Sequence, residues 1–248
     1  MKIYFREDIS ERIQKIAVQK DWLPFKTLPE GLTEGFVLMR DEEKRLAILD
    51  LSEPSWSPFC IDFLEPQWLL RLKKVQHETQ LIKRAIGFKP QDNILIWDAT
   101  AGLGRDAIVL AHLGYRVIAV ERSFILFELL QDAIERAKQS SEFDESLSRL
   151  TLVHGDSRDL LSQLKEDERP EVIYLDPMYP ATKKTAQPKK EMQILRKLLG
   201  PDDNLNELID VARAIAKKKV ILKNSPRASL ELKPKHSLES KSVRFDVF

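Results

Sequence analysis

The feature that most constrains this chain is a glycine turn between two apolar runs, with an acidic residue ending the second run. In chain order the pieces are the run Ile94–Trp97, the turn Asp98–Asp106, the helical run Ala107–His112, the run Val117–Val120 and the acid Glu121. A strand, a glycine turn, a helix and a second strand ending in an acid form a nucleotide-binding half. Gly102 permits the tight turn, Gly104 lets a ligand approach the backbone, and Glu121 can accept hydrogen bonds from both hydroxyls of a ribose. The stretch therefore predicts an adenosine-cofactor site.

Two carboxylates beside the glycine turn bear on which cofactor binds there. The segment Gly102–Ala107 fits the pattern G-x-G-x-x-G/A, so a dinucleotide is an open alternative. A pyrophosphate would sit on the helix N-terminus, where Asp106 in the first turn and Asp98 at the preceding strand end would both repel it. S-adenosylmethionine has no phosphate and carries a sulfonium and an ammonium, which carboxylates attract. We therefore favour S-adenosylmethionine, although a helix-capping acid and an ordinary strand–helix turn would each explain part of the pattern.

A second motif follows the apolar run Val172–Leu175, where the chain continues Asp-Pro-Met-Tyr. It resembles the Asp-Pro-Pro-Tyr signature of amino-methyltransferases, with Met178 in place of the second proline. An exocyclic amine on a base is a poor nucleophile because its lone pair is delocalised into the ring, so acceptors on its N–H groups can fix it and let the nitrogen pyramidalise. We expect the Asp176 carboxylate and the Pro177 carbonyl to be those acceptors and the Tyr179 ring to stack on the base. The alternative is a strand end, a proline turn and a core tyrosine.

Charge is unevenly distributed along the chain. The net charge of the whole chain is +1, yet residues 181–248 carry sixteen Lys and Arg against eight Asp and Glu, a balance of +8. A basic last quarter beside a base-handling motif indicates nucleic acid, although a solvated lysine-rich surface explains the charge equally well. We expect RNA contacts from the lysines after the second motif and from a basic residue near the C-terminus, namely Lys183, Lys184, Lys189, Lys190 and Arg244. Lys223, at the end of a predicted strand, is a further candidate to line the site.

Cysteine, histidine and hydropathy patterns exclude several other classes. The single cysteine, Cys60, excludes an intrachain disulfide and fits a reducing cytosol, so a cytoplasmic protein is expected. No apolar run is long enough to span a bilayer, and the first residues lack a signal-peptide layout, so no membrane partner is expected. The four histidines have no metal-ligand spacing, so no metal is expected.

Three segments organise the chain. Residues 1–65 are expected to form a small N-terminal α+β domain with short strands at 2–5, 35–39, 46–49 and 59–63 and a helix over residues 10–20. Residues 66–90 are expected to form a linking helix, because apolar positions recur at helical spacing before Gly87 and Pro90. Residues 91–248 are expected to form the main domain.

The main domain alternates strand-like and helix-like stretches. Strands are expected at 94–99, 117–121, 150–154, 172–176 and 219–223, and helices at 105–113, 123–139, 158–165, 188–199 and 204–217. This alternation predicts a parallel doubly wound sheet. The last strand, Val243–Phe248, is expected to be the antiparallel seventh strand, with Leu230–Leu232 as its partner. Asp156 and Ser157, after the third strand, could hydrogen-bond an adenine edge, with a plain turn as the alternative.

The combination of motifs resembles a known family. Asp98–Ala107, Glu121–Arg122, Tyr174–Pro180, Lys189–Met192 and Arg244–Val247 resemble the bacterial RsmJ-type methyltransferases, over a region from about Phe59 to the C-terminus. That resemblance implies a class I S-adenosylmethionine methyltransferase, with a Rossmann-like seven-stranded sheet, that modifies N2 of a guanosine in small-subunit ribosomal RNA. The implied partner is ribosomal RNA or the small ribosomal subunit. Its cofactor residues would fall on Arg105, Asp106, Glu121, Arg122, Asp156, Ser157 and Asp176.

Alternative functions are open at this point. One is methylation of another RNA or DNA amine, and another is a non-catalytic RNA-binding module that retains the fold. A nicotinamide-dependent oxidoreductase is disfavoured because the sequence offers no evident proton-relay pair of Tyr and Lys or of His.

Overall fold

The computed structural model describes the chain except for residues 28–30, 74–76, 178–189, 201–204, 229 and 231. The chain separates into two compact units, each made of several chain segments. Unit 1 comprises Met1–Phe63, Glu128–Ala137 and Lys184–Gly200, and unit 2 comprises Leu64–Phe127, Lys138–Lys183 and Pro201–Phe248. In the described part of the chain, every helix is too short or too polar to cross a bilayer.

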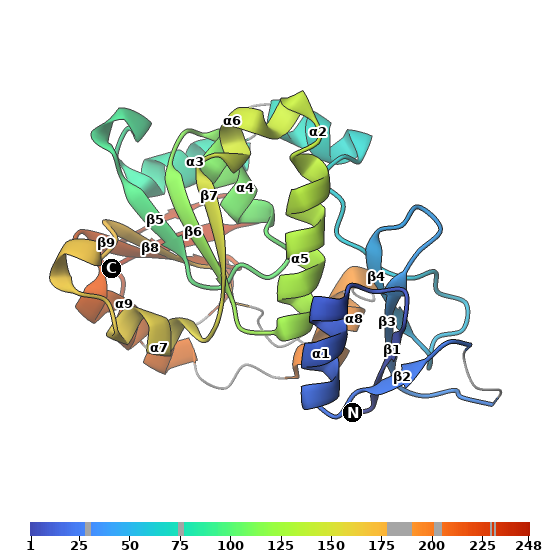
Figure 1. Cartoon of the computed structure of the whole chain (residues 1–248). Coiled ribbons are helices and arrows are strands. Elements are labelled where there is room, and N and C mark those ends of the chain that lie inside the picture. The colour runs from blue at the N-terminus through green and yellow to red at the C-terminus, as the bar shows by residue number, and fades with distance from the viewer. Residues whose placement is uncertain (28–30, 74–76, 178–189, 201–204, 229, 231) are drawn as a thin grey trace. The chain divides into compact units, whose positions relative to one another are not determined.

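Unit 2 is built on a seven-stranded sheet (Figure 1). Its strands in chain order are β5 (Leu95–Asp98), β6 (Arg116–Glu121), β7 (Leu150–His154), β8 (Val172–Leu175), β9 (Lys219–Asn224), β10 (His236–Glu239) and β11 (Arg244–Val247). The order across the sheet is β10-β11-β9-β8-β5-β6-β7. Strand β11 is antiparallel to both neighbours, and the pairs among β5 to β9 are parallel. The predicted doubly wound α/β sheet with an antiparallel strand is therefore confirmed.

Helices cover both faces of this sheet. Those of unit 2 are α2 (Pro66–Lys73), α3 (His77–Ile86), α4 (Arg105–His112), α6 (Asp144–Leu147), α7 (Ser157–Ser162) and α9 (Leu205–Ile215), and α5 (Phe124–Ala137) runs from unit 2 into unit 1. Short 3-10 helices span Pro90–Asp92, Ser141–Phe143 and Glu166–Glu168. The linking helix expected over residues 66–90 corresponds to α2 and α3, and residues 74–76 between them lie outside the described residues.

Alternation along the strands assigns side chains to the two faces. Ile173 and Leu175 of β8 belong to a core cluster with Leu222 of β9 and with Leu208 and Ile209 of α9. Helices α7 and α9 lie side by side over this face (Figure 1). Because successive strand residues point to opposite faces, the residues between them point toward α4. The carboxyl ends of β5 and β8 thus present their alternate side chains to the first turn of α4, at the point where strand order reverses and ligands of such sheets bind.

Unit 1 has its own four-stranded sheet. Its elements are β1 (Ile3–Arg6), α1 (Glu11–Gln19), β2 (Leu23–Phe25), β3 (Phe36–Arg40), β4 (Leu46–Asp50), the part of α5 from Glu128 on, and α8 (Lys190–Leu199). The order is β2-β1-β3-β4, with β3 and β4 antiparallel and the other pairs parallel. Ser10 caps α1 by accepting a hydrogen bond from the Ile13 amide, as the sequence predicts.

One predicted strand pairing and one predicted strand are wrong. Strand β11 pairs with β10 on one side and with β9 on the other, not with Leu230–Leu232, and the Lys235 amide extends the pairing to β10 by donating to the Val247 carbonyl. Leu230 and Leu232 instead pack against the core cluster on the α9 face. Their apolar–polar–apolar pattern imitates a strand, whereas β10 is largely exposed and has little apolar signal. The predicted strand over residues 59–63 forms a single bridge, between Phe59 and Ile48.

Candidate functional site

The glycine turn links the end of β5 to α4 through residues with left-handed backbone geometry. Gly102 has φ +54° and Gly104, the residue before α4, has φ +70°. A side chain in this region would be strained, so the turn requires glycine at both positions. The hydroxyl of Thr100 in the same turn accepts a hydrogen bond from the Asp176 amide at 2.6 Å. That bond ties the turn to the end of β8 and holds the two predicted motifs together.

Glu121 lies at the carboxyl end of β6 and is 5% exposed. One carboxylate oxygen accepts from the Gly102 amide at 2.9 Å and the other from the Ser123 amide at 2.7 Å. Burial raises the pKa of Glu121 to about 7, despite the opposing effect of these two hydrogen bonds. Each oxygen keeps a second lone pair for a ligand, so the geometry is compatible with binding a diol.

Four side chains form a bonded cluster at the carboxyl ends of β8 and β9, which we name the lysine–carboxylate cluster: Asp106, Tyr174, Asp176 and Lys223. The Lys223 ammonium donates to Asp106 Oδ2 at 2.6 Å and to Asp176 Oδ2 at 2.9 Å. The Tyr174 hydroxyl donates to the same Asp106 oxygen at 2.7 Å. The cluster therefore connects the first turn of α4 to the strand end that precedes Pro177.

A third carboxylate lies beside the cluster. Asp98 ends β5, is 2% exposed and accepts from the Thr100 amide at 3.2 Å. Burial, followed by repulsion from Asp106, raises the pKa of Asp98 well above its usual value. Desolvation likewise raises the pKa of Asp176 to about 6, with Lys223 acting in the opposite direction. The site is thus rich in carboxylates that gain from a nearby cation and would repel a phosphate.

Asp156 and Ser157 stand at the start of α7. The Asp156 side chain caps this helix by accepting from the Arg158 amide at 2.9 Å, and it pairs with the Arg158 guanidinium at 2.7 Å. Arg158 also pairs with Glu207. Ser157 is buried and donates to the Ala99 carbonyl at 2.6 Å. Both residues therefore have structural partners, and Ser157 anchors α7 to the end of β5.

The remaining predicted site residues divide between described and undescribed positions. Arg105 begins α4 and Arg122 follows Glu121, and both are exposed. Pro177 is buried directly after Asp176. Lys190, the first residue of α8 in unit 1, donates to the Ser57 hydroxyl at 3.0 Å. The other predicted contacts lie outside the described residues: Tyr179, Lys183, Lys184 and Lys189.

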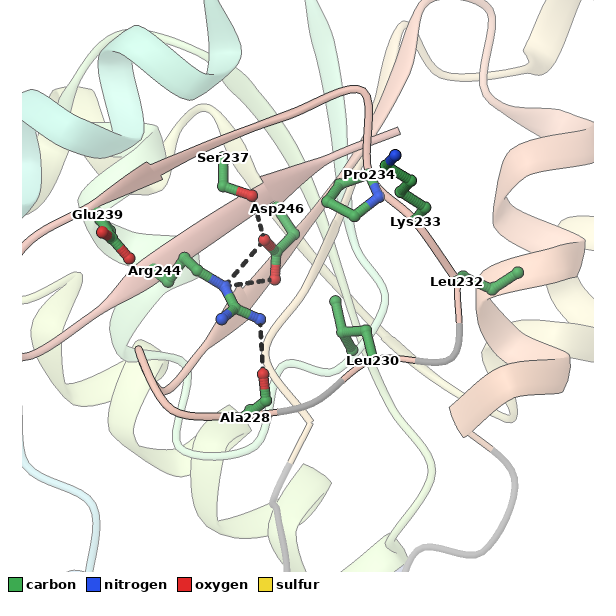
Figure 2. Close-up of a pocket in the computed structure, with 9 residues that line it drawn as sticks. All are labelled: Ala228, Leu230, Leu232, Lys233, Pro234, Ser237, Glu239, Arg244 and Asp246. Atoms are coloured by element: carbon green, nitrogen blue, oxygen red, sulfur yellow. Dashed lines mark hydrogen bonds and ion pairs between the residues drawn. The ribbon is translucent and has the colours of Figure 1, made fainter.

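Arg244 has structural partners in unit 2. Its Nε donates to both oxygens of Asp246, at 2.9 and 3.0 Å, and its terminal nitrogens donate to the carbonyls of Pro226 at 3.0 Å and Ala228 at 2.9 Å. Arg244 lines a pocket of about 510 Å³. Figure 2 shows its guanidinium with the Asp246 carboxylate and the Ala228 carbonyl as partners. These bonds involve all three nitrogens of the guanidinium that was expected to contact RNA.

Comparison with known proteins shows the family to which the chain belongs. Residues 26–248 match the family model described as "Putative SAM-dependent methyltransferase". A protein named ribosomal RNA small subunit methyltransferase J from Thioalkalivibrio sulfidiphilus is 37% identical, and the match covers 99% of this chain and 95% of that relative. A protein of the same name from Pseudoalteromonas atlantica is 40% identical, and the match covers 88% of this chain and 86% of that relative. The chain belongs to the ribosomal RNA small subunit methyltransferase J family. It is therefore an S-adenosylmethionine-dependent methyltransferase and not a nicotinamide-dependent oxidoreductase.

A solved structure supports this family assignment. The SAM-dependent methyltransferase NGO1261 from Neisseria gonorrhoeae superposes with a TM-score of 0.75 at 27% identity. The match covers 100% of this chain and 95% of that protein. The similarity therefore extends over both units and not only over the seven-stranded sheet.

The hydrogen bonds of the site include two residues that the sequence motifs did not indicate. Neither Tyr174 nor Thr100 was a candidate, yet both hold acids of the site. Tyr174 could have been found from strand alternation, because it precedes Asp176 by two residues and so faces the same side of the sheet. Thr100 carries no such signal, since its partner lies 76 residues away in sequence.

Proposed function

We propose that this chain transfers a methyl group from S-adenosylmethionine to the exocyclic N2 amine of a guanosine in small-subunit ribosomal RNA. The observation that carries the proposal is the position of Asp176 at the end of β8: its backbone amide donates to Thr100 of the glycine turn, and its carboxylate lies beside Asp106 and Asp98. The names of the relatives support ribosomal RNA as the substrate class. Guanosine N2 follows from the resemblance to RsmJ-type enzymes and from the Asp-Pro-x-Tyr motif.

The donor set fits this cofactor by charge and by geometry. We assign the ribose hydroxyls to Glu121 and the positively charged methionine portion to the side of the site occupied by Asp98 and Asp106. The space beside Gly102 is open, because a Cβ there would meet nothing nearer than the Thr100 carbonyl oxygen at 3.8 Å, and we assign this space to the ligand. When bound, S-adenosylmethionine supplies a methyl group that is already electrophilic because it sits on a sulfonium.

The chain's own residues then have to orient the amine and take its proton. We assign the two N–H groups of the amine to the Asp176 carboxylate and the Pro177 carbonyl, which lie on consecutive residues. As the N–C bond forms and the S–C bond breaks with its electron pair on sulfur, the N–H electron pair stays on nitrogen and the proton would pass to Asp176. The fixed geometry of the proline turn suits this positioning.

The proposal is tested by methyl transfer to defined substrates. Small ribosomal subunits and naked ribosomal RNA from cells lacking the enzyme are incubated with the purified chain and a labelled donor, and the modified base is located by mass spectrometry. Label on N2 of a single guanosine is the expected result. Label on another amine, or on none, contradicts the proposal.

Affinity for the cofactor product should depend on pH through Glu121. Ribose hydroxyls donate to an ionised carboxylate. Because the pKa of Glu121 is raised to about 7, this carboxyl group is protonated below that pH and must lose its proton when the ligand binds. We expect S-adenosylhomocysteine to bind about tenfold more weakly at about pH 6 than at about pH 8, measured by calorimetry. Glu121→Gln should weaken binding and remove this pH dependence. An unchanged pH dependence in Glu121→Gln would assign the titration to another group.

The lysines after the second motif should contribute to RNA affinity electrostatically. Exchange of Lys183 and Lys184 for alanine should weaken RNA binding and reduce the slope of log affinity against log salt by about 2. The measurement is a filter-binding titration at several salt concentrations. The matched control is Lys138→Ala, an exposed lysine at the end of α5. A slope equal to that of the wild type removes both lysines from the interface.

A further inference from the structure

The side chain of Lys223 joins two of the site's carboxylates. It lies on β9, and its ammonium is within hydrogen-bonding distance of Asp106 Oδ2 and Asp176 Oδ2, at 2.6 and 2.9 Å. Its side chain is only 23% exposed, against 14% for Asp106 and 39% for Asp176. A long cationic side chain held away from water in this way is stable only because both carboxylates pair with it.

The sheet fixes this geometry from the backbone outward. Leu222 pairs with Leu175, so Lys223 and Asp176 are the next residues along two adjacent parallel strands. On the other side Lys223 pairs with Phe245 of β11, an apolar neighbour that cannot compete for the ammonium. The Asp106 carboxylate is held in turn by the Tyr174 hydroxyl at 2.7 Å. Lys223 thus approaches Asp176 from a rigid strand and uses one of its two oxygens.

The charges at this end of the sheet require a fixed cation. The titratable groups that face Lys223 are Asp98 from β5, Asp106 from α4, and Tyr174 and Asp176 from β8. Without the ammonium, Asp176 would lie beside the like charge of Asp106. Protonation of Asp176 would then remove the repulsion between the two carboxylates. A protonated Asp176 cannot take the proton that the amine loses. It is also a poorer hydrogen-bond acceptor with which to hold the amine for transfer.

We propose that Lys223 is a positioning residue for methyl transfer: it fixes Asp176 through Oδ2, leaves Oδ1 to face the substrate amine, and keeps the carboxylate ionised. This inference rests on the proposed function. In the transfer itself the N–C bond forms, the S–C bond breaks with its electron pair on sulfur, and the amine proton moves to Asp176. Lys223 remains protonated throughout and retains Asp106 as its partner after that proton arrives.

The test compares charge removal with charge retention at residue 223. The pH profile of kcat is measured at saturating donor and RNA for the wild type, Lys223→Met and Lys223→Arg. Lys223→Met should lower kcat at least about tenfold at neutral pH and should move the acidic limb of the profile upward by about one pH unit or more, because an opposite charge near a carboxylate shifts its titration by that amount. Lys223→Arg keeps the charge, so its acidic limb should stay near that of the wild type.

A matched control lies on the same strand. Lys219, at the opposite end of β9, donates to the Ala85 carbonyl at 3.3 Å and lies outside the lysine–carboxylate cluster. Lys219→Met should therefore leave the acidic limb and kcat at their wild-type values. If Lys223→Met does not fold, Lys223→Gln replaces it, since glutamine keeps a donor while removing the charge, and the same upward shift is expected.

Three outcomes overturn the inference. A folded Lys223→Met or Lys223→Gln with a wild-type acidic limb shows that Lys223 does not keep Asp176 ionised. An acidic limb in Lys223→Arg displaced as far as in Lys223→Met shows that shape, and not charge, is what the site requires. A wild-type protein that transfers no methyl group overturns the proposed function and this inference with it, whereas the first two results leave the proposed function standing.

Discussion

Replacing Asp176 with alanine is expected to abolish methyl transfer, with kcat reduced by at least about a hundredfold. The variant removes the acceptor that we assign to the amine and its proton. The loss should appear in kcat more than in the KM for the donor, because the ribose contacts that we assign to Glu121 are untouched. Lys223 keeps its bond to Asp106 at 2.6 Å, so the strand end should remain ordered.

Steady-state transfer to ribosomal particles, together with calorimetric binding of S-adenosylhomocysteine, checks this prediction. Asp167→Ala is the matched control, since Asp167 is an exposed acid in a short 3-10 helix of unit 2, away from the site. A folded Asp176→Ala enzyme with wild-type turnover would show that another group handles the amine.

Replacing Asp132 with alanine is expected to lower the free energy of unfolding by about 3–5 kcal/mol, the usual cost of removing one partner from a buried ion pair. Asp132 lies on α5 within unit 1, and its side chain is 10% exposed. One oxygen pairs with Arg40, and the other accepts from Arg136 at 2.9 Å and from the Leu46 amide at 3.1 Å. The substitution therefore removes a carboxylate partner from two guanidinium groups and leaves the buried Leu46 amide without its acceptor. Both guanidinium groups keep other acceptors: the Lys44 carbonyl for Arg40, and Asp62 and the Ile61 carbonyl for Arg136.

Urea denaturation followed by circular dichroism measures this loss, and the thermal midpoint should fall by about 2–4 °C for each kcal/mol. Glu135→Ala on the same helix is the control. Glu135 is exposed and bonds only to Gln131 among the partners that the structure describes, so its loss should change stability by less than about 0.5 kcal/mol. Equal stabilities of the two variants would mean that the Asp132 network contributes no net stability.

Local sequence patterns predicted the elements of unit 2 well. The expected strands at 117–121, 150–154 and 172–176 correspond to β6, β7 and β8 with shifts of one residue or none at each end. Buried strands read as continuous apolar runs, and the glycines of the turn after β5 have a conformational requirement that local sequence alone can signal. In residues 1–63 the expected strands at 2–5, 35–39 and 46–49 correspond to β1, β3 and β4, whereas β2 spans only three residues and the single bridge at Phe59 offers no repeating pattern.

Polar contacts between residues far apart in the sequence could not be predicted from local sequence patterns. Asp132 and Arg136 lie in the helix expected over residues 123–139, and in unit 1 they bind Arg40, the Leu46 amide and Asp62. These contacts join residues that are 74 to 92 positions apart in sequence. An exposed-looking charge and a buried, paired charge have the same appearance in a sequence, because burial depends on what other segments cover it.

The amino-acid sequence by itself determined the strand–turn–helix order, the glycine turn, the acid ending β6 and the Asp-Pro pair after β8, because each depends on backbone requirements or on periodicity within a few residues. Only the tertiary structure decided that Lys223 reaches Asp106 and Asp176, that Thr100 ties the two motifs together, and that Arg244 is held by the carbonyls of Pro226 and Ala228. Electrostatic partners are chosen by distance in space, and the sheet brings together side chains that chain order keeps far apart.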